Sequence, residues 1–241
     1  MMRRLCLRVA AVTLGASILV GCIGGKSQPS RFYVLSRLPS ETGKQVAAAE
    51  QGLTIGVGPV SLPPYLDRPE IVTRSGGNEI HLSEFDRWAE PLRQNFIRVL
   101  AENLSILIPT DRTAVFPWER SIPVNYQVVV EVTRFEGNAD GNSLLMARWS
   151  IFGADRKQEL LARQSSFSEP IGPPQDYKAT VSAMSRSLAD LSREIAAAIK
   201  TLSQQSKSCS GAATRSTDDA GDRRRGDHAV RLCDLAEGNA A

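Results

Sequence analysis

A long apolar stripe near the C-terminal end of the sequence sets the first condition on the fold. Between residues 177 and 202, apolar side chains recur at spacings of three and four, the period of an amphipathic helix of about seven turns. The members of the stripe are Tyr177, Val181, Met184, Leu188, Leu191, Ile195, Ile199 and Leu202. This face needs either a sheet or a coiled-coil partner. Because partner heptads are missing elsewhere, the stripe predicts packing on a sheet, with Asp176 capping the helix start.

The strands for such a sheet are predicted directly before the helix. Apolar and polar residues alternate over residues 126–133, which is the period of a strand buried on one face. Turn formers fill residues 137–142. The next strand then carries Leu145, Ala147, Trp149 and Ile151 on its apolar face. A second turn at 153–158 leads to a third strand at 159–170, so the sequence predicts an antiparallel meander.

Four shorter strands and another helix are predicted earlier in the chain. The strands are Phe32–Leu35, Leu53–Val60, Glu70–Arg74 and Asn78–Ser83. The helix follows Trp88, and its apolar stripe is Leu92, Phe96, Val99, Leu100 and Leu104. Together these elements predict an α+β fold. We expect one domain over residues 31–202, with a twisted, largely antiparallel sheet and both amphipathic helices on one of its faces.

The first residues have the layout of a secretory signal. Three arginines precede an uncharged run at residues 9–20, which is too short to span a bilayer, because a membrane helix needs about 20 apolar residues. Leu19-Val20-Gly21-Cys22 resembles the bacterial lipobox, whose cysteine is alkylated with diacylglycerol. Residues 1–21 are therefore predicted as a signal peptide and Cys22 as the lipid attachment site. Several acyl chains, such as palmitate, would anchor the tether formed by residues 22–30. An ordinary signal peptide with an incidental cysteine is the alternative.

Charge and composition limit the possible partners. The chain has 29 Lys and Arg residues and 26 Asp and Glu residues, so loss of the three signal arginines leaves 26 of each sign. A neutral chain lacks the basic footprint of a nucleic-acid-binding protein, and we expect no such partner. Residues 203–241 are rich in Ser, Gly, Ala, Asp and Arg, which predicts a disordered tail. Cys209 and Cys233 in this tail either pair in an oxidising compartment or remain free.

The stretch from residue 55 to residue 92 carries several separate motifs in a fixed order. They are Gly56-Val57-Gly58-Pro59-Val60, Leu62-Pro63, Tyr65-Leu66-Asp67-Arg68-Pro69, Ile71-Val72-Thr73-Arg74 and Arg87-Trp88-Ala89-Glu90-Pro91-Leu92. With the lipobox and Phe32–Leu35, this order resembles the PqiC-like lipoproteins, also called the ABC-type transport auxiliary lipoprotein family. The resemblance covers residues 31–202, and the tail after Ser203 has no counterpart in it.

This resemblance implies a periplasmic lipoprotein of a lipid transport system. Members of the family work with tunnel-forming proteins of the mammalian-cell-entry (MCE) type and with an ABC transporter, and they support envelope integrity. The lipoprotein would dock the tunnel at the outer membrane. Ile23 agrees with that location, because an inner-membrane retention signal would place aspartate there. A homo-oligomeric ring would suit a tunnel mouth.

The matched stretch also supplies candidate partner-binding residues, namely Tyr65, Leu66, Asp67, Arg68, Arg87 and Trp88. Three prolines, at positions 63, 64 and 69, keep the segment out of a central strand, so it is predicted at a sheet edge or in an ordered surface loop. An aromatic residue beside an arginine is typical of an interface hot spot.

A purely structural interpretation of the same residues also remains open. Tyr65 and Leu66 would then pack under the loop, and Trp88 would pack between helix and sheet. Asp67 and Arg68 would pair with each other or with Arg87 and Glu90.

The sequence contains little that points to catalysis. His81 is the one histidine of the predicted domain and has no neighbouring cysteine, and neither Gly-x-Ser-x-Gly nor His-Glu-x-x-His occurs. Asp67 with Glu84 or Asp86 could form a carboxylate pair, but nothing further supports a glycosidase. We therefore expect no enzyme, no catalytic residue, no metal site and no cofactor other than the covalent lipid. Two other functions remain as alternatives: a periplasmic carrier that holds lipid in its own cavity, and an envelope hydrolase.

Overall fold

The computed structural model describes residues 28–39, 50–108, 110–119, 122–172 and 176–218. By contacts the chain divides into residues 1–30 and residues 31–241, and the fold described below belongs to the second unit. The expectations for the signal peptide, Cys22 and Cys233 lie outside the described residues. Of the first unit only residues 28–30 are described, and all three are exposed.

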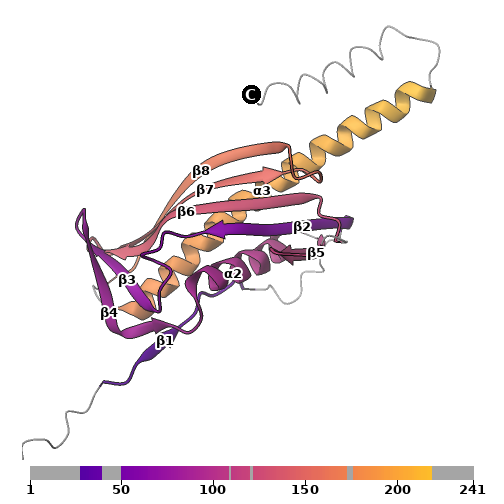
Figure 1. Cartoon of the computed structure of the whole chain (residues 1–241). Coiled ribbons are helices and arrows are strands. Elements are labelled where there is room, and N and C mark those ends of the chain that lie inside the picture. Colours follow the sequence, from indigo (N-terminus) through magenta and orange to yellow (C-terminus); the bar gives the residue numbers. More distant parts are fainter. Residues whose placement is uncertain (1–27, 40–49, 109, 120–121, 173–175, 219–241) are drawn as a thin grey trace, which may run out of the picture. The chain divides into compact units, whose positions relative to one another are not determined.

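The second unit has the predicted α+β fold, and its described residues form one sheet of eight strands beside two helices (Figure 1). The first five strands are β1 (Arg31–Tyr33), β2 (Glu50–Ser61), β3 (Glu70–Ser75), β4 (Glu79–Trp88) and β5 (Thr110–Val115). The other three are β6 (Tyr126–Asn138), β7 (Asn142–Phe152) and β8 (Glu159–Pro170). The helices are α2 (Leu92–Leu107) and α3 (Tyr177–Asp218). Each predicted element is present, and β5 is an additional strand that the sequence analysis missed.

The sheet is mixed rather than largely antiparallel. The predicted meander β6–β7–β8 is antiparallel, as is the pair β3–β4. The pairs β1–β4, β2–β5, β2–β6 and β3–β6 are parallel. Turn residues report only the connections between neighbouring strands, whereas these parallel pairs join segments that are far apart in the sequence. The strand order β1-β4-β3-β6-β2-β5 therefore could not be predicted from local signals.

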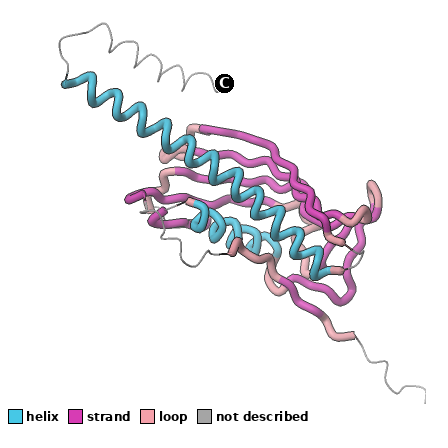
Figure 2. The backbone as a smooth tube through the Cα atoms, turned by 180° about the vertical axis from the view of Figure 1, so that it is seen from behind, coloured by secondary structure: helices cyan, strands magenta, loops and turns pink. Residues whose placement is uncertain are grey.

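Both helices lie on one face of the sheet, as predicted (Figure 2). α2 packs against β2, β5 and α3, whereas α3 covers β6, β7 and β8. The stripe residues of α2 are fully buried, and Phe96 meets Phe135 of β6 edge to face at 5.4 Å between ring centroids. The α3 stripe is buried from Tyr177 to Ile199. Full burial of each such large side chain contributes roughly 1.5–3 kcal/mol to the free energy of unfolding.

Helix α3 continues beyond the boundary that composition predicted. Its start is capped as expected, since the Ala179 amide donates to Asp176 Oδ1 at 2.9 Å. The helix then runs through Ser203 to Asp218, so the expected change to disorder at Ser203 is wrong for that part of the chain. Many residues there are weak helix formers, but a packed helix precedes them, so nucleation is already complete and only extension of the helix is required.

The segment that follows β1 is held between the two helices by buried polar side chains. The Leu35 amide donates to Asn95 Oδ1 at 2.7 Å, and the Leu38 amide donates to Asn103 Oδ1 at 2.8 Å. Asn103 in turn donates to Ser192 Oγ of α3 at 3.1 Å. These side chains replace the strand partner that an extended backbone would otherwise need. The N-terminal end of the domain is therefore fixed to both helices.

Candidate functional site

The loop of residues 62–69, here called the docking loop, is an ordered surface connection between β2 and β3. This confirms the expectation from its three prolines. The Leu66 amide donates to the Pro63 carbonyl and the Arg68 amide to the Leu66 carbonyl, both at 2.9 Å. At the end of the loop, the Trp88 amide donates to the Pro69 carbonyl at 2.8 Å. The loop is thus tied both to itself and to β4.

A buried carboxylate, Glu136 of β6, fixes the middle of the docking loop. Its side chain is fully buried and accepts the Tyr65 hydroxyl at 3.0 Å. The Nε atoms of Arg74 and Arg134 both donate to Glu136 Oε1 at 2.9 Å. The Arg74 guanidinium also lies 5.7 Å from the centroid of the Tyr65 ring. We call Tyr65, Arg74, Arg134 and Glu136 the Glu136 cluster.

The position of the Glu136 cluster follows from the sheet. One edge of β6 pairs with β2 as far as Glu131 and with β3 only from Gly137, so the strand partner changes between these residues. Here the Phe135 amide donates to Glu136 Oε2 at 2.9 Å. An unpaired buried amide would be costly. Glu136 therefore accepts the Phe135 amide where β6 changes its strand partner, and it also accepts the Tyr65 hydroxyl of the docking loop.

Two groups of the cluster, Tyr65 and Arg74, have raised pKa values. Burial, followed by the negative charge of Glu136, raises the pKa of the Tyr65 hydroxyl. The hydrogen bond to Glu136 raises the pKa of the Arg74 guanidinium. Both shifts favour the protonated forms of Tyr65 and Arg74, and these are the forms that donate to the Glu136 carboxylate.

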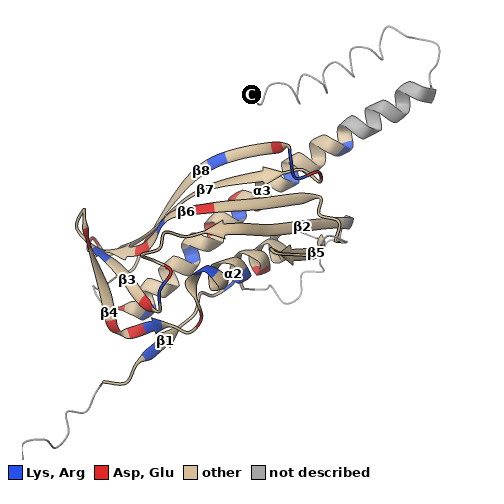
Figure 3. Ribbon diagram, in the orientation of Figure 1, with Lys and Arg blue, Asp and Glu red and all other residues tan. Residues whose placement is uncertain are grey.

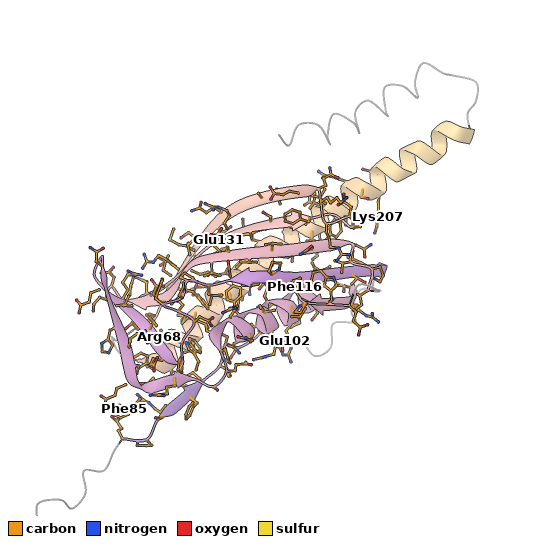
Figure 4. All side chains as sticks on the ribbon, in the orientation of Figure 1. Arg68, Phe85, Glu102, Phe116, Glu131 and Lys207 are labelled. Atoms are coloured by element: carbon orange, nitrogen blue, oxygen red, sulfur yellow. The ribbon has the colours of Figure 1, made fainter. Side chains whose placement is uncertain are left out.

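Of the other candidates in the docking loop, Leu66 is buried and the two charged residues form ion pairs. Asp67 pairs with Arg93 of α2, and Arg68 Nε lies 3.0 Å from Glu70 Oε2. Both partners differ from the structural interpretation, which paired Asp67 and Arg68 with each other or with Arg87 and Glu90. Arg68 remains on the surface at the end of the sheet near β3 and β4 (Figure 4).

The two candidates on β4 differ in burial. Trp88 is 5% exposed and belongs to the core, as the structural interpretation anticipated. Arg87 is half-buried, opposite Glu70 of β3 in register, and its Nε atom is buried without a hydrogen-bond partner. The candidates therefore form two groups. Tyr65, Leu66 and Trp88 are bound or buried on the inner side of the loop, whereas Asp67, Arg68 and Arg87 are partly exposed.

A second buried carboxylate, Asp86, fastens strand β1 to β4. Asp86 Oδ1 accepts the Tyr33 hydroxyl at 2.9 Å and lies 2.8 Å from Arg31 Nε, while Asp86 Oδ2 accepts the Ser83 hydroxyl at 3.0 Å. Burial alone would raise the pKa of the Asp86 carboxyl, but the hydrogen bonds from Arg31, Tyr33 and Ser83 outweigh it and lower the pKa. We call these four residues the Asp86 cluster. These contacts give Asp86 a structural role, the attachment of β1 to β4.

The Gly56-Val57-Gly58 motif has a steric explanation. A Cβ at Gly56 would lie 2.8 Å from the Trp118 ring, and one at Gly58 would lie 2.8 Å from Phe116 Cβ. Gly58 also has a φ of 115°, which favours glycine. Phe116 and Trp118 meet edge to face at 5.5 Å over these two glycines. The motif thus makes room on β2 for the residues that follow β5.

Other features bear on function only weakly. Acidic and basic side chains are interspersed along the described elements (Figure 3). His81 is exposed on β4. Over the residues that the structure describes, three or more His, Cys, Asp or Glu side chains do not gather where they could hold a metal ion. Within that same part of the chain, neither helix combines the length and apolar character needed to cross a membrane.

Sequence reasoning missed the residues that organise both clusters. Arg74 stands inside a recognised motif, yet nothing local assigns it to Tyr65. Glu136 and Asp86 bind partners 71 and 53 residues away in sequence, respectively. The one available signal was a charged residue within an otherwise buried strand, since such a charge must be paired.

Comparison with known proteins agrees with this fold. The chain is 28% identical over 140 residues to the intermembrane transport lipoprotein PqiC of Escherichia coli K12 and, equally, to that of Shigella flexneri. The alignment covers 58% of this chain and 72% of either relative. A crystal structure of a Xanthomonas campestris protein aligns with a TM-score of 0.59 at 16% identity, covering 73% of this chain and 99% of the other.

The family itself is established by a family model. The model for the ABC-type transport auxiliary lipoprotein component matches residues 33–196. This range includes the docking loop, the Glu136 cluster and the first 20 of the 42 residues of α3. The chain therefore belongs to the family of ABC-type transport auxiliary lipoprotein components.

Proposed function

We propose that this chain is an outer-membrane lipoprotein that faces the periplasm and docks an MCE-type tunnel protein. It would serve there as a non-catalytic auxiliary subunit of intermembrane lipid transport driven by an ABC transporter, and so support envelope integrity. Membership of the transport auxiliary family and the likeness to an intermembrane transport lipoprotein support this assignment. The lipobox that ends at Cys22 supports the anchor, which would consist of diacylglycerol and fatty acyl chains such as palmitate.

The observation that carries the docking role is a rigid loop with a polar outer surface. Leu66 is buried and Tyr65 is bound to Glu136, so the loop does not need to be ordered when a partner arrives. Pre-organisation of this kind lowers the entropic cost of binding. In our proposal Asp67, Arg68 and Arg87 contact the tunnel protein. Tyr65, Leu66 and Trp88 hold these contact residues in position.

A ring of several copies of this chain would enclose the mouth of a tunnel, because closed rotational symmetry creates an axis. We include a homo-oligomeric ring in the proposal for this reason. A chromatographic and mass measurement of the acylated chain in detergent would give the number of copies, and a strictly monomeric chain would remove this part of the proposal.

The docking role is tested by co-purification from crosslinked cell envelopes. We expect the wild-type chain to retain a membrane-spanning MCE-type protein and Arg68→Ala to lose most of it. Arg148→Ala is the matched control, because Arg148 is also a surface arginine paired with a glutamate, Glu131 of β6, but lies on strand β7 instead of in the docking loop. Equal retention by wild type and Arg68→Ala would contradict the contact role of the loop. Absence of any such partner from the wild type would contradict the proposed function.

A further inference from the structure

The first strand of the domain has an inverted pattern of side chains. Arg31 and Tyr33 bind the buried Asp86, and Leu35 is 2% exposed, so the odd-numbered residues face the protein. The even-numbered residues face away from it. Phe32 is 64% exposed and Val34 is 46% exposed. A soluble edge strand normally turns polar side chains outward and apolar ones inward, because exposed apolar edges associate with other surfaces.

These two apolar side chains are held outward by a rigid frame. The Asp86 cluster fixes one face of β1, and the amide of Leu35 is bound to Asn95 of α2. Phe32 also lies opposite Arg87 of β4 in register. Turning Phe32 inward would require the strand to leave Asp86, so its exposure follows from the way β1 is attached.

The chain outside this structure indicates what would cover the pair. If Cys22 carries the lipid, the anchor lies nine residues before Arg31, and nine fully extended residues reach at most about 30 Å. Phe32 and Val34 therefore belong to the part of the domain that the tether keeps nearest to the bilayer. Arg31 and Arg37, with side chains 57% and 49% exposed, flank the pair. Arg31 pairs with Asp86 and Arg37 with Glu102, but each guanidinium has five N–H donors and can also donate to a phospholipid phosphate.

We propose that Phe32 and Val34 insert into the interface of the phospholipid bilayer that holds the anchor. This inference rests on the proposed lipid anchor and goes beyond it, because it gives the domain a fixed orientation on the membrane. An acyl anchor alone allows the domain to rotate freely on its tether. Insertion of an aromatic and an aliphatic side chain beside two arginines would bind β1 to the bilayer, with the rest of the sheet extending away from it.

The test uses a tryptophan substitution in the full acylated chain. The Phe32→Trp protein is reconstituted into vesicles of phosphatidylethanolamine and phosphatidylglycerol, with and without brominated acyl chains. We expect the added tryptophan emission to shift to shorter wavelength on reconstitution and to be quenched strongly by the brominated lipid. Wild-type protein supplies the background emission of its three tryptophans.

The matched control is Phe116→Trp. Phe116 is 47% exposed beside an equally exposed valine, Val115, at another edge strand of the same sheet (Figure 4). The emission of the tryptophan added at this position is expected to show no quenching by brominated lipid. Unquenched emission from Phe32→Trp, or equal quenching of both variants, would overturn the proposal; the first result would point to a protein partner for the pair. Mass spectrometry of Cys22 on the same sample reports the anchor separately, so loss of the anchor is distinguished from loss of the contact.

Discussion

The Asp86 cluster and the Glu136 cluster use the same chemistry for two different attachments. In each, a buried strand carboxylate accepts a tyrosine hydroxyl and pairs with arginine, and in each the tyrosine belongs to a peripheral segment. Tyr33 brings in strand β1, which continues from the tether, whereas Tyr65 brings in the docking loop. The two clusters therefore attach to one sheet the segments proposed to meet the membrane and the partner.

The clusters differ in how readily water can replace a hydrogen bond that the carboxylate no longer accepts. Glu136 has a fully buried side chain and also accepts the Phe135 amide, and the side chains of Arg74 and Arg134 are only 19% and 31% exposed. Arg31, the cation of the Asp86 cluster, is more than half exposed and can turn into solvent. A buried donor that loses its acceptor pays its full desolvation cost, whereas an exposed donor finds water. A substitution at Glu136 should thus destabilise the whole sheet, whereas a substitution at Asp86 should destabilise only the attachment of β1.

The largest effect is expected for Glu136→Gln. The amide group replaces one carboxylate oxygen with a donor, so two of the four present donors lose their acceptor and both arginines lose their counter-charge. We expect the free energy of unfolding to fall by about 3 kcal/mol. Urea denaturation followed by tryptophan fluorescence measures this change.

The matched control for this change is Glu131→Gln on the same strand. Glu131 is 56% exposed and pairs with Arg148 at 3.4 Å, so its loss should cost less than about 0.5 kcal/mol. If the two variants were equally stable, Glu136 would contribute no more than a surface ion pair, and the difference between the clusters would disappear.

The sequence alone could predict the fold better than these clusters, for a physical reason. The helical stripes and the β6–β8 meander depend on periods and turns that a few neighbouring residues display, and all of them are present. Strand β5 is short and mostly polar, and it has no turn signal to a sequence neighbour, so it was missed.

The candidate site depends on contacts that local patterns do not contain. Sequence reasoning selected the docking loop correctly as an ordered surface segment, but it could not decide whether Tyr65 stands outward or binds inward. That choice is made by Glu136, which is 71 residues away. The burial of Leu66 and Trp88 likewise follows from the way the loop lies against β4 and the core.

A smaller effect is expected for Asp86→Asn, together with a change in pH dependence. The substitution weakens the hydrogen bonds from Tyr33 and Ser83, and we expect a loss of about 1.5 kcal/mol at neutral pH. Because the folded pKa of Asp86 is lowered, its stabilisation is fully present above the ordinary value of 3.8 and is lost as the pH falls through the folded pKa. The stability gap between wild type and variant should therefore narrow below about pH 4.

Hydrogen exchange should locate this effect. The amides of β1 are expected to exchange faster in Asp86→Asn, while those of β6 are unchanged. Glu84→Gln is the control on the same strand, because Glu84 is exposed. Faster exchange throughout the sheet would contradict a local role for Asp86. A difference in the free energy of unfolding between wild type and Asp86→Asn that grows at acid pH would contradict the expected pH dependence.

Removing one hydroxyl from each cluster compares the two attachments most directly. Tyr65→Phe should lower the free energy of unfolding by about 1 kcal/mol, because Glu136 Oε2 is buried and then keeps only the Phe135 amide. Tyr33→Phe should cost about 0.5 kcal/mol, because Asp86 Oδ1 retains Arg31. Chemical denaturation of both variants measures which of them loses more free energy of unfolding. A larger loss for Tyr33→Phe would contradict the view that the Glu136 cluster is the stronger attachment.

The smallest effect is the coupling between the clusters, measured with the double variant Glu136→Gln/Asp86→Asn. The clusters share no residue, so their separate losses should add within about 0.5 kcal/mol. The neighbouring pair Glu136→Gln/Tyr65→Phe should instead be clearly less than additive, because both changes remove the same hydrogen bond.

The strands that carry Arg74 and Asp86, β3 and β4, are paired, so a path for coupling exists. A coupling energy above about 1 kcal/mol between Glu136 and Asp86 would mean that the membrane-side and partner-side attachments respond as one unit. Force or lipid contact at β1 could then alter the docking loop, whereas additive losses leave the two attachments independent.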